Sequence, residues 1–244
     1  MCLSKTKWIG LRKYRWDGDV IVHECIVPSS RPAVGAKGKE YDIDAREFLV
    51  TEHNEVIRRT LRRDIREYLR ANPIGSFDTF QSREPGSFDA RVDLIASFVA
   101  DEIAYKSRPR DRLAIPDETL SLRHGDCEDR AFLTASLMLA SGVSAFNIRV
   151  ALGKVKETRG GRAVASRDGK GKDHVWVMYK TESGDWAVVE PIPTKNRLRA
   201  GARAAARAAS AGPSALEYVP YFLVNDHHLW AVRHPENREA SRIS

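Results

Sequence analysis

Apolar residues recur at helical spacing between residues 54 and 70, in a stretch that is otherwise rich in arginine. These apolar positions follow one another at four-residue steps and form one stripe, made of Val56 or Ile57, Leu61, Ile65 and Leu69. The periodicity predicts an amphipathic helix. Asn54 or Thr51 is its expected N-cap. Asn72-Pro73 should end it, because the residue before a proline disfavours the helical conformation.

Two further helices are predicted from apolar patterns. One runs from about Asp89 to Lys106 and carries an apolar face. The other follows Cys127, where an apolar run from Ala131 to Leu139 stops at Ser141-Gly142.

Alternating apolar and polar residues predict strands in the second half of the chain. The predicted strands are Ile148–Val155, His174–Tyr179, Trp186–Glu190, Tyr218–Val224 and Leu229–Val232. In the first half we predict a strand over Val20–Val27 and a loop over Ser29–Lys39, which holds proline and glycine. Residues 73–88 are rich in glycine, proline, serine and phenylalanine and are predicted to be a linker. We therefore divide the chain into an N-terminal extension at 1–87 (a strand plus a basic helix), a core at 88–235 and a C-terminal tail at 236–244.

The composition is that of a globular protein: 244 residues, 42% hydrophobic and 30% charged. No apolar run reaches the roughly 18 residues that a membrane span needs. The first residues also lack the apolar stretch of a signal peptide. We therefore expect a cytoplasmic protein with no membrane partner.

The net charge of +7 fits an acidic partner or a nucleic acid, and it also fits an ordinary surface. The outer face of the predicted helix at 54–70 carries six arginines: Arg58, Arg59, Arg62, Arg63, Arg66 and Arg70. Acidic neighbours at Glu55, Asp64 and Glu67 dilute this charge. We favour a solvated basic face over a phosphate-binding one, so nucleic acid is an open but less favoured partner.

The cysteines are Cys2, Cys25 and Cys127, an odd number that does not suggest a disulfide framework. No Cys-x-x-Cys or His-Glu-x-x-His spacing indicates a metal site. Cys127 differs from the other two because it lies at the start of a predicted helix. Unpaired N–H groups and the helix dipole favour a thiolate there, and one N–H is placed to bind an oxyanion. We interpret Cys127 as a nucleophile, with Asp126, Glu128 and Asp129 as helix-capping residues.

A cysteine nucleophile needs a base and a group that orients the base. The candidates are His174, at the start of one predicted strand, and Glu190, at the end of the next. A three-residue loop, Glu182-Ser183-Gly184, would place Trp176 opposite Glu190 and His174 diagonally from it on the same face. A two-residue loop would put His174 and Glu190 on opposite faces.

Several alternatives stay open at this stage. Asp173 and Asp185 are fallback orienting groups, and His124 is a spare histidine. Trp176 is a candidate for the second oxyanion donor, although a core tryptophan beside the histidine is favoured. The adjacent His227-His228 is not favoured as a metal site, because neighbouring side chains on a strand or turn point apart.

These residues resemble the transglutaminase-like superfamily. The stretch Gly125-Asp126-Cys127-Glu128-Asp129, with the apolar run after it, is similar to the nucleophile segment of that family, and Pro116–Leu120 fits as well. His174-Val175-Trp176-Val177 resembles the histidine strand. Trp186–Pro191 resembles the acidic strand, where this chain has Glu190 in place of the usual aspartate. The resemblance covers roughly residues 88–232 and does not extend to residues 1–87.

The resemblance implies an α+β, papain-like fold in which the cysteine helix packs on an antiparallel sheet. It implies a peptidase or amidase whose Cys127, His174 and Glu190 cleave an amide, peptide or ester bond through a thioester. It implies no cofactor, and no twelve-residue calcium loop appears in the sequence. The basic segments 159–172 and 197–207 suggest an acidic peptide or protein substrate. Rival functions are acyl transfer to an amine, and protein or nucleic-acid binding without turnover.

Overall fold

The computed structural model describes residues 6–9, 12–17, 20–23, 28–35, 37–51, 53–72, 74–106, 113–159, 162–163, 172–190 and 214–232. The strands are β1 (Thr6–Ile9), β2 (Arg12–Asp17), β3 (Val20–His23), β4 (Pro28–Val34), β5 (Glu40–Asp44), β6 (Ala104–Tyr105), β7 (His124–Gly125), β8 (Ile148–Arg159), β9 (Arg162–Ala163), β10 (Lys172–Lys180), β11 (Trp186–Val189), β12 (Ser214–Val224) and β13 (Leu229–Val232). The α-helices are α1 (Glu55–Arg59), α2 (Ile65–Ala71), α3 (Phe77–Gln81), α4 (Ser87–Glu102), α5 (Pro116–Leu122) and α6 (Cys127–Ala140). Short 3-10 helices span Ala45–Phe48 and Ala145–Asn147.

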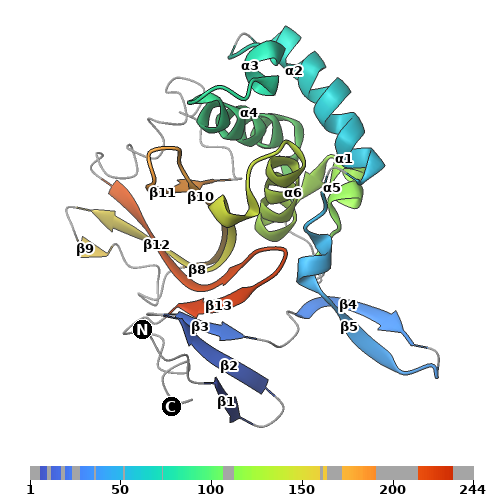
Figure 1. The fold of residues 1–244 in the computed structure, drawn as a ribbon, viewed down its shortest axis with the longest axis vertical. Helices are drawn as coiled ribbons and strands as arrows, with labels where there is room; N and C mark the ends of the chain where they lie inside the picture. Colours follow the sequence, from blue (N-terminus) through green and yellow to red (C-terminus); the bar gives the residue numbers. More distant parts are fainter. Residues whose placement is uncertain are drawn as a thin grey trace.

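A large antiparallel sheet forms one layer of the molecule (Figure 1). Its strand order is β1-β2-β3-β13-β12-β8-β10-β11, with β9 added beside β8. The pairing of β13 with β3 joins the N-terminal strands to the rest of the sheet. The predicted α+β class, with a cysteine-bearing helix packed on an antiparallel sheet, is confirmed.

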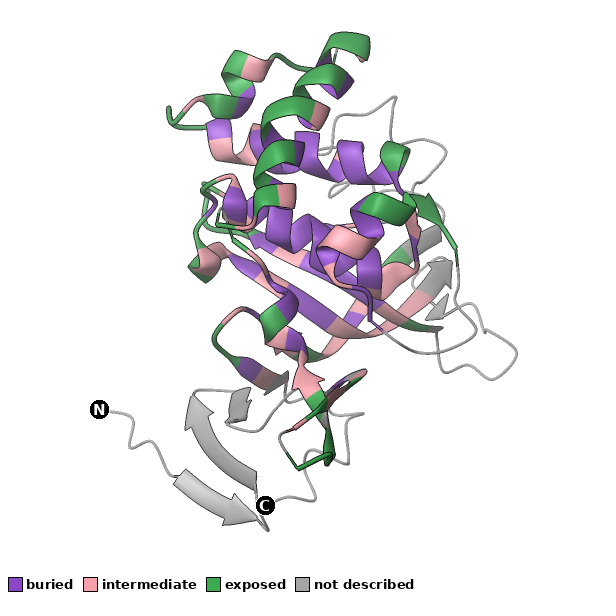
Figure 2. Ribbon diagram, turned by 90° about the vertical axis from the view of Figure 1, so that its right-hand side faces the viewer, coloured by how far each residue is buried: buried purple, intermediate pink, exposed green. Residues whose placement is uncertain are grey.

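The hydrophobic core lies between this sheet and the helices. Helix α6 packs on β8 and β10, and α4 packs beside α6. Ile95, Leu133, Val150 and Val177 are fully or almost fully buried in one cluster. Figure 2 shows the buried segments gathered where the helices face the sheet.

The predicted helix at 54–70 is confirmed, with Asn54 as its N-cap through a hydrogen bond from the Ile57 N–H. Its middle section, Thr60–Asp64, is a π-helical turn that links α1 to α2. All the expected stripe positions are buried: Ile57, Leu61, Ile65 and Leu69. A strict four-residue repeat drifts around an ordinary helix of 3.6 residues per turn. The wider π turn reduces that drift, so the stripe keeps facing the core.

Three local predictions were wrong, and in each a tertiary contact explains the difference. Helix α4 ends at Glu102 instead of Lys106, because Ala104 and Lys106 donate backbone hydrogen bonds to Arg123 and Gly125. The predicted loop at 29–39 instead contains most of β4, which pairs with β5 across an irregular register. The predicted linker at 73–88 contains α3, whose Phe80 is buried in the core.

The N-terminal segment shares the core of the rest of the chain. The Ser136 hydroxyl on α6 donates to the Phe48 carbonyl and accepts from the Val50 N–H. Arg31 forms an ion pair with Glu118 on α5, at 2.6 Å. The side chains of β1 to β3, together with Cys2 and Cys25, lie outside the described residues. Across the described ranges, every helix is too short or too polar to span a bilayer.

Candidate active site

A tight turn between α5 and α6 leads to Cys127, the first residue of α6. Helix α5 ends at Leu122, and the left-handed backbone of its C-cap Arg123 (φ 54°) turns the chain into β7. Gly125 then passes close to Asp129, and a Cβ added at Gly125 would lie 2.6 Å from the Asp129 Cβ. Glycine is therefore required here for the backbone to approach the start of the helix.

Asp126 and Asp129 cap the N-terminus of α6 in a reciprocal capping box. The Asp126 carboxylate accepts from the N–H groups of Glu128 and Asp129, and the buried Asp129 carboxylate accepts from the Asp126 N–H. Asp129 also accepts from the Ala114 N–H, at 2.7 Å. The predicted capping role of Asp126 and Asp129 is thus confirmed. Within the described part of the chain, the N–H of Cys127 has no acceptor and remains available.

The β10–β11 hairpin has the predicted register. Its observed pairs run from Lys180 opposite Trp186 to Val177 opposite Val189. The three-residue loop closes through a hydrogen bond from the Thr181 N–H to the Asp185 carbonyl, with Gly184 at φ 94°. The next step of this register places Trp176 opposite Glu190, so His174 and Glu190 lie diagonally on one face.

His174 contacts both of the other predicted site residues. Its Nε2 donates to the Glu190 carboxylate, at 3.1 Å from Oε1 and 3.2 Å from Oε2. The Cys127 side chain lies close enough to His174 to raise the pKa of the imidazole. Since Nε2 faces Glu190, Nδ1 is the nitrogen that remains for the thiol. The structure therefore brings Cys127, His174 and Glu190 together.

The surroundings of His174 favour its protonated form. Burial of the imidazole lowers its pKa, but the interaction with Cys127, together with the hydrogen bond to Glu190 and the charge of Glu190, outweighs burial. The pKa of His174 is raised from 6.5 to about 9. At neutral pH the ring is an imidazolium that can act as an acid.

Trp176 and Gly153 support the histidine from its own sheet. The Trp176 ring stacks on His174 at 6.1 Å and is fully buried, which fits the favoured interpretation as a core tryptophan. Its Nε1 has no hydrogen-bond partner among the described residues. Gly153 pairs with His174 in the sheet, and a Cβ there would lie 2.1 Å from the Val219 carbonyl oxygen and 3.0 Å from the Trp176 ring. A side chain at position 153 would therefore force these strands apart.

Sequence reasoning missed Tyr218, whose hydroxyl donates to Glu190 Oε2 at 2.6 Å. Tyr218 lies on β12, which reaches the site from beyond residues 191–213, and no short hairpin fixes its register to β8. Tyr105 on β6 was also missed. Burial raises the pKa of Tyr105, as do the nearby charges of Cys127 and Asp126. The position of Tyr218 depends on the strand order of the large sheet, and that of Tyr105 depends on the pairing of β6 with β7; neither is encoded in local spacing.

The alternative residues lie elsewhere. Asp173 is 92% exposed and faces Lys154, and Asp185 lies in the hairpin turn. His124 lies on β7, with its Nδ1 buried and without a partner among the described residues. His227 and His228 form the β12–β13 turn, where both N–H groups donate to the Asn225 side chain. The described ranges contain no cluster of three or more histidine, cysteine or acidic residues able to hold a metal. The basic segments 159–172 and 197–207 fall largely outside the described residues.

Comparison with known proteins identifies a family for the central part of the chain. The sequence model of the transglutaminase-like superfamily matches residues 78–191. No curated protein matches the chain. Among solved structures, calcium-bound Legionella pneumophila LapG is 18% identical, with 76% of this chain and 90% of that chain covered and a TM-score of 0.45. A second Legionella pneumophila LapG structure is 17% identical, with 80% and 94% covered and a TM-score of 0.44.

Proposed function

Residues 78–191 belong to the transglutaminase-like superfamily, and from this premise we propose that the protein is a thiol enzyme that cleaves amide or peptide bonds. The observation that supports the proposal is that His174 is hydrogen-bonded to Glu190 and lies close enough to Cys127 for the two side chains to influence each other electrostatically. A nucleophile, a base and an orienting acid in hydrogen-bond contact are the arrangement that nucleophilic catalysis requires.

The reaction begins with attack of the Cys127 sulfur on the substrate carbonyl carbon. The carbonyl oxygen becomes an oxyanion, and the N–H of Cys127, which has no acceptor among the described residues, would donate a hydrogen bond to it. The imidazolium of His174 then gives its proton to the leaving amine as the C–N bond breaks. This leaves the acyl group on Cys127 as a thioester and His174 as neutral imidazole.

Hydrolysis completes the cycle. His174 takes a proton from water as the water oxygen attacks the thioester carbonyl. The C–S bond breaks, the carboxylic acid product leaves, and the thiolate–imidazolium pair is restored. Glu190 keeps the imidazole oriented throughout, and Tyr218 holds the Glu190 carboxylate in place.

The substrate that this chemistry requires is a peptide or protein that presents an amide carbonyl. A decisive test incubates the whole protein with a complex peptide mixture and identifies new termini by mass spectrometry. Cleavage that is lost in Cys127→Ala and His174→Ala and retained in Cys25→Ala, which also removes one thiol, would support the proposal. Cleavage that persists in Cys127→Ala would refute it. Products that carry an added amine instead of a new carboxylate would identify acyl transfer.

A further inference from the structure

Four exposed arginines form a row along the α1–α2 helix. They recur at four-residue steps beside the buried apolar stripe: Arg58, Arg62, Arg66 and Arg70. A step of four residues at 1.5 Å rise places neighbouring members of the row about 6 Å apart along the axis. The π turn that keeps the apolar stripe aligned applies equally to this row, because each arginine follows a stripe residue by one position.

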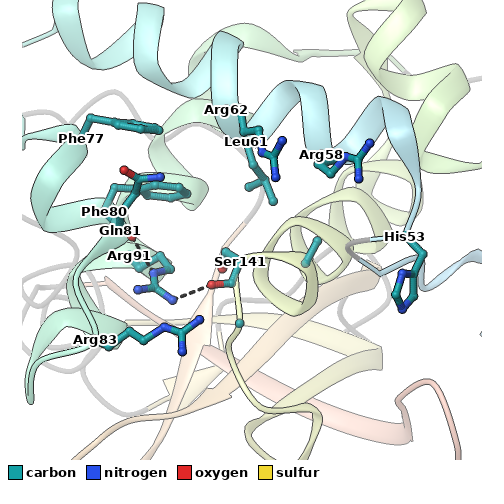
Figure 3. A pocket seen from close by; sticks show the side chains of 12 residues that line it. His53, Arg58, Leu61, Arg62, Phe77, Phe80, Gln81, Arg83, Arg91 and Ser141 are labelled. Carbon is teal, nitrogen blue, oxygen red and sulfur yellow. Dashed lines mark hydrogen bonds between the residues drawn. The ribbon is translucent and has the colours of Figure 1, made fainter.

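Two pockets open along this row. The first, of about 450 Å³, is lined by Arg58 and Arg62 together with Arg83, Arg91 and His53. Figure 3 shows Arg62 and Arg83 reaching into it from different elements. The second, of about 330 Å³, is lined by Arg66 and Arg70. No carboxylate is among the described residues that line either pocket.

Arg91 places a positive charge in a fixed position in the lining of the first pocket. The residue is only 3% exposed. Its guanidinium donates to the carbonyls of Phe80, at 2.8 Å, and Ser141, at 2.5 Å, and to that of Ser82. The Ser141 carbonyl belongs to the negative end of α6, which would otherwise repel an anion. By covering it, Arg91 makes this end of the helix compatible with a negatively charged ligand.

Phe77 connects the two pockets, since it lines both. Its ring stacks near Phe80 at 5.9 Å, and the Arg66 guanidinium lies over it at 4.4 Å. Planar guanidinium and aromatic groups are the surfaces on which nucleobases stack, and the arginine fork also matches phosphate oxygens. The row therefore combines regularly spaced cations with a stacking surface at its centre.

We propose that this surface, defined by Arg58, Arg62, Arg66, Arg70 and Phe77, binds single-stranded nucleic acid. The phosphates follow the arginine row, and bases enter the two pockets on either side of Phe77. Two pockets in succession suit an extended ligand better than one small anion. The shared aromatic ring and the exclusive use of arginine favour bases and phosphates over the carboxylates of an acidic peptide. Glu55, which forms an ion pair with Arg58, is a carboxylate that would compete with the ligand at one end of the row.

The proposed surface is separate from the candidate active site. Ala140, Ser141 and Gly142 line the first pocket at the C-terminal end of α6, whereas Cys127 begins that helix. A helix of 14 residues is about 20 Å long. Binding should therefore persist in Cys127→Ala, and failure of the enzyme proposal would leave this one untouched.

The test is fluorescence anisotropy of labelled single-stranded RNA and DNA 12-mers with the whole protein, titrated over a range of salt concentrations. The row variant Arg62→Gln/Arg66→Gln should weaken binding at least tenfold. It should also reduce the slope of log affinity against log salt by about 1.4, since each lost phosphate contact on a single strand contributes about 0.7. The matched control is Arg59→Gln/Arg63→Gln, which removes the same amount of charge from the same helix. Arg59 and Arg63 line neither pocket, so this control should change the affinity less than twofold. Circular dichroism would verify that both variants remain folded.

Two further measurements address the ligand class. Phe77→Leu keeps the charge and removes the stacking ring, and should weaken oligonucleotide binding several-fold. Poly-glutamate of equal charge should compete poorly. Equal losses in the row and control variants would overturn the proposal by revealing a non-specific charge effect. Equally tight binding of poly-glutamate, or of a mononucleotide, would overturn it in favour of an acidic peptide or a small anion.

Discussion

The Glu190 carboxylate receives hydrogen bonds from two side chains, His174 Nε2 and the Tyr218 hydroxyl. Its position is therefore determined by contacts from two strands, β10 and β12, in addition to β11, which ends at the preceding residue. A carboxylate held from both sides can fix the orientation of the imidazole ring to which it is hydrogen-bonded. The extra methylene of glutamate, relative to the aspartate usual in the family, is accommodated because the histidine lies diagonally across the hairpin.

Replacement of Glu190 by glutamine should keep the size of the side chain and remove its charge. The pKa of His174 should then fall below about 9, because both the charge of Glu190 and its hydrogen bond raise it. Loss of the orienting acid costs about 10⁴-fold in kcat in a serine protease triad, so we expect a loss of between one and four orders of magnitude here.

Tyr218→Phe, which leaves the carboxylate in place, should cost less than tenfold in kcat. Histidine NMR titration and the pH profile of kcat/KM measure both effects; an unchanged His174 pKa in Glu190→Gln would contradict this account.

The raised pKa of His174 predicts how stability depends on pH. The folded protein holds the His174 proton up to about pH 9, whereas the unfolded chain releases it near 6.5. Between these values the folded state binds more protons, so the free energy of unfolding falls as pH rises. The contribution is complete below pH 6.5 and is lost as pH passes about 9, and it amounts to about 3 kcal/mol.

Urea unfolding of the wild type and His174→Gln at pH 6 and pH 9.5 isolates this contribution. The wild type should lose about 3 kcal/mol more than the variant between the two pH values. Parallel losses in the two proteins would show that another group governs the pH dependence.

At the residue scale, the candidate site residues that could be predicted are those whose positions depend on spacing over a short stretch of the sequence. Cys127 follows from its position before an apolar run, and His174 and Glu190 from the odd length of one hairpin loop. Tyr218 could not be predicted, because β12 lies more than twenty residues beyond Glu190 and its partner strand is fixed only by the sheet order. The role of Gly153 could not be predicted either. Glycine is needed at this position because Val219 and Trp176, on the neighbouring strands, leave no room for a side chain.

At the element scale, the β10–β11 hairpin connects the candidate site to the helical layer. Glu182, in its turn, accepts from the N–H groups of Gly86, Phe88 and Asp89 at the start of α4. Asp89 accepts in return from the Glu182 N–H, at 3.0 Å. Helix α4 has no cap from its own Gly86, so the hairpin supplies one. The same contact fixes the hairpin against the helix.

Deletion of Ser183 should therefore separate the candidate site residues. A two-residue loop shifts the register by one and turns Glu190 to the face opposite His174. We expect activity to fall at least a thousandfold, while Ser183→Ala, which keeps the loop length, should retain activity within about twofold. Full activity in the deletion variant would show that Glu190 is not the orienting group.

Element boundaries were less predictable than element types. The apolar pattern of α4 continues to Ala104, but backbone pairing of β6 with β7 ends the helix at Glu102. Likewise, the prolines of β4 suggested a loop, yet the strand is accommodated in an isolated hairpin with an irregular register. At α4 the pairing with a distant segment outweighs local helix propensity, and at β4 the pairing with the neighbouring strand β5 outweighs the effect of the prolines.

At the scale of the whole molecule, one hydrophobic core extends across the predicted boundary after residue 87. Ile57 and Ile65 lie in the same cluster as Ile95 and Leu133, and all four are fully buried. A chain that begins at residue 88 would expose the apolar surface that these N-terminal side chains cover. We expect it to lose cooperative thermal unfolding, as measured by calorimetry. If the truncated chain instead unfolds cooperatively, and iodoacetamide labels its Cys127 as fast as in the whole protein, residues 88–235 form an independent domain.

The central claim is that His174 activates Cys127, and iodoacetamide labelling at pH 7 followed by mass spectrometry tests it most directly. Cys2 and Cys25 serve as internal references in the same sample. We predict that Cys127 in the wild type is alkylated at least tenfold faster than either reference. His174→Ala should remove this advantage while the protein stays folded. If Cys127 reacts no faster than Cys2 and Cys25, and His174→Ala changes nothing, the proposed thiol chemistry is wrong.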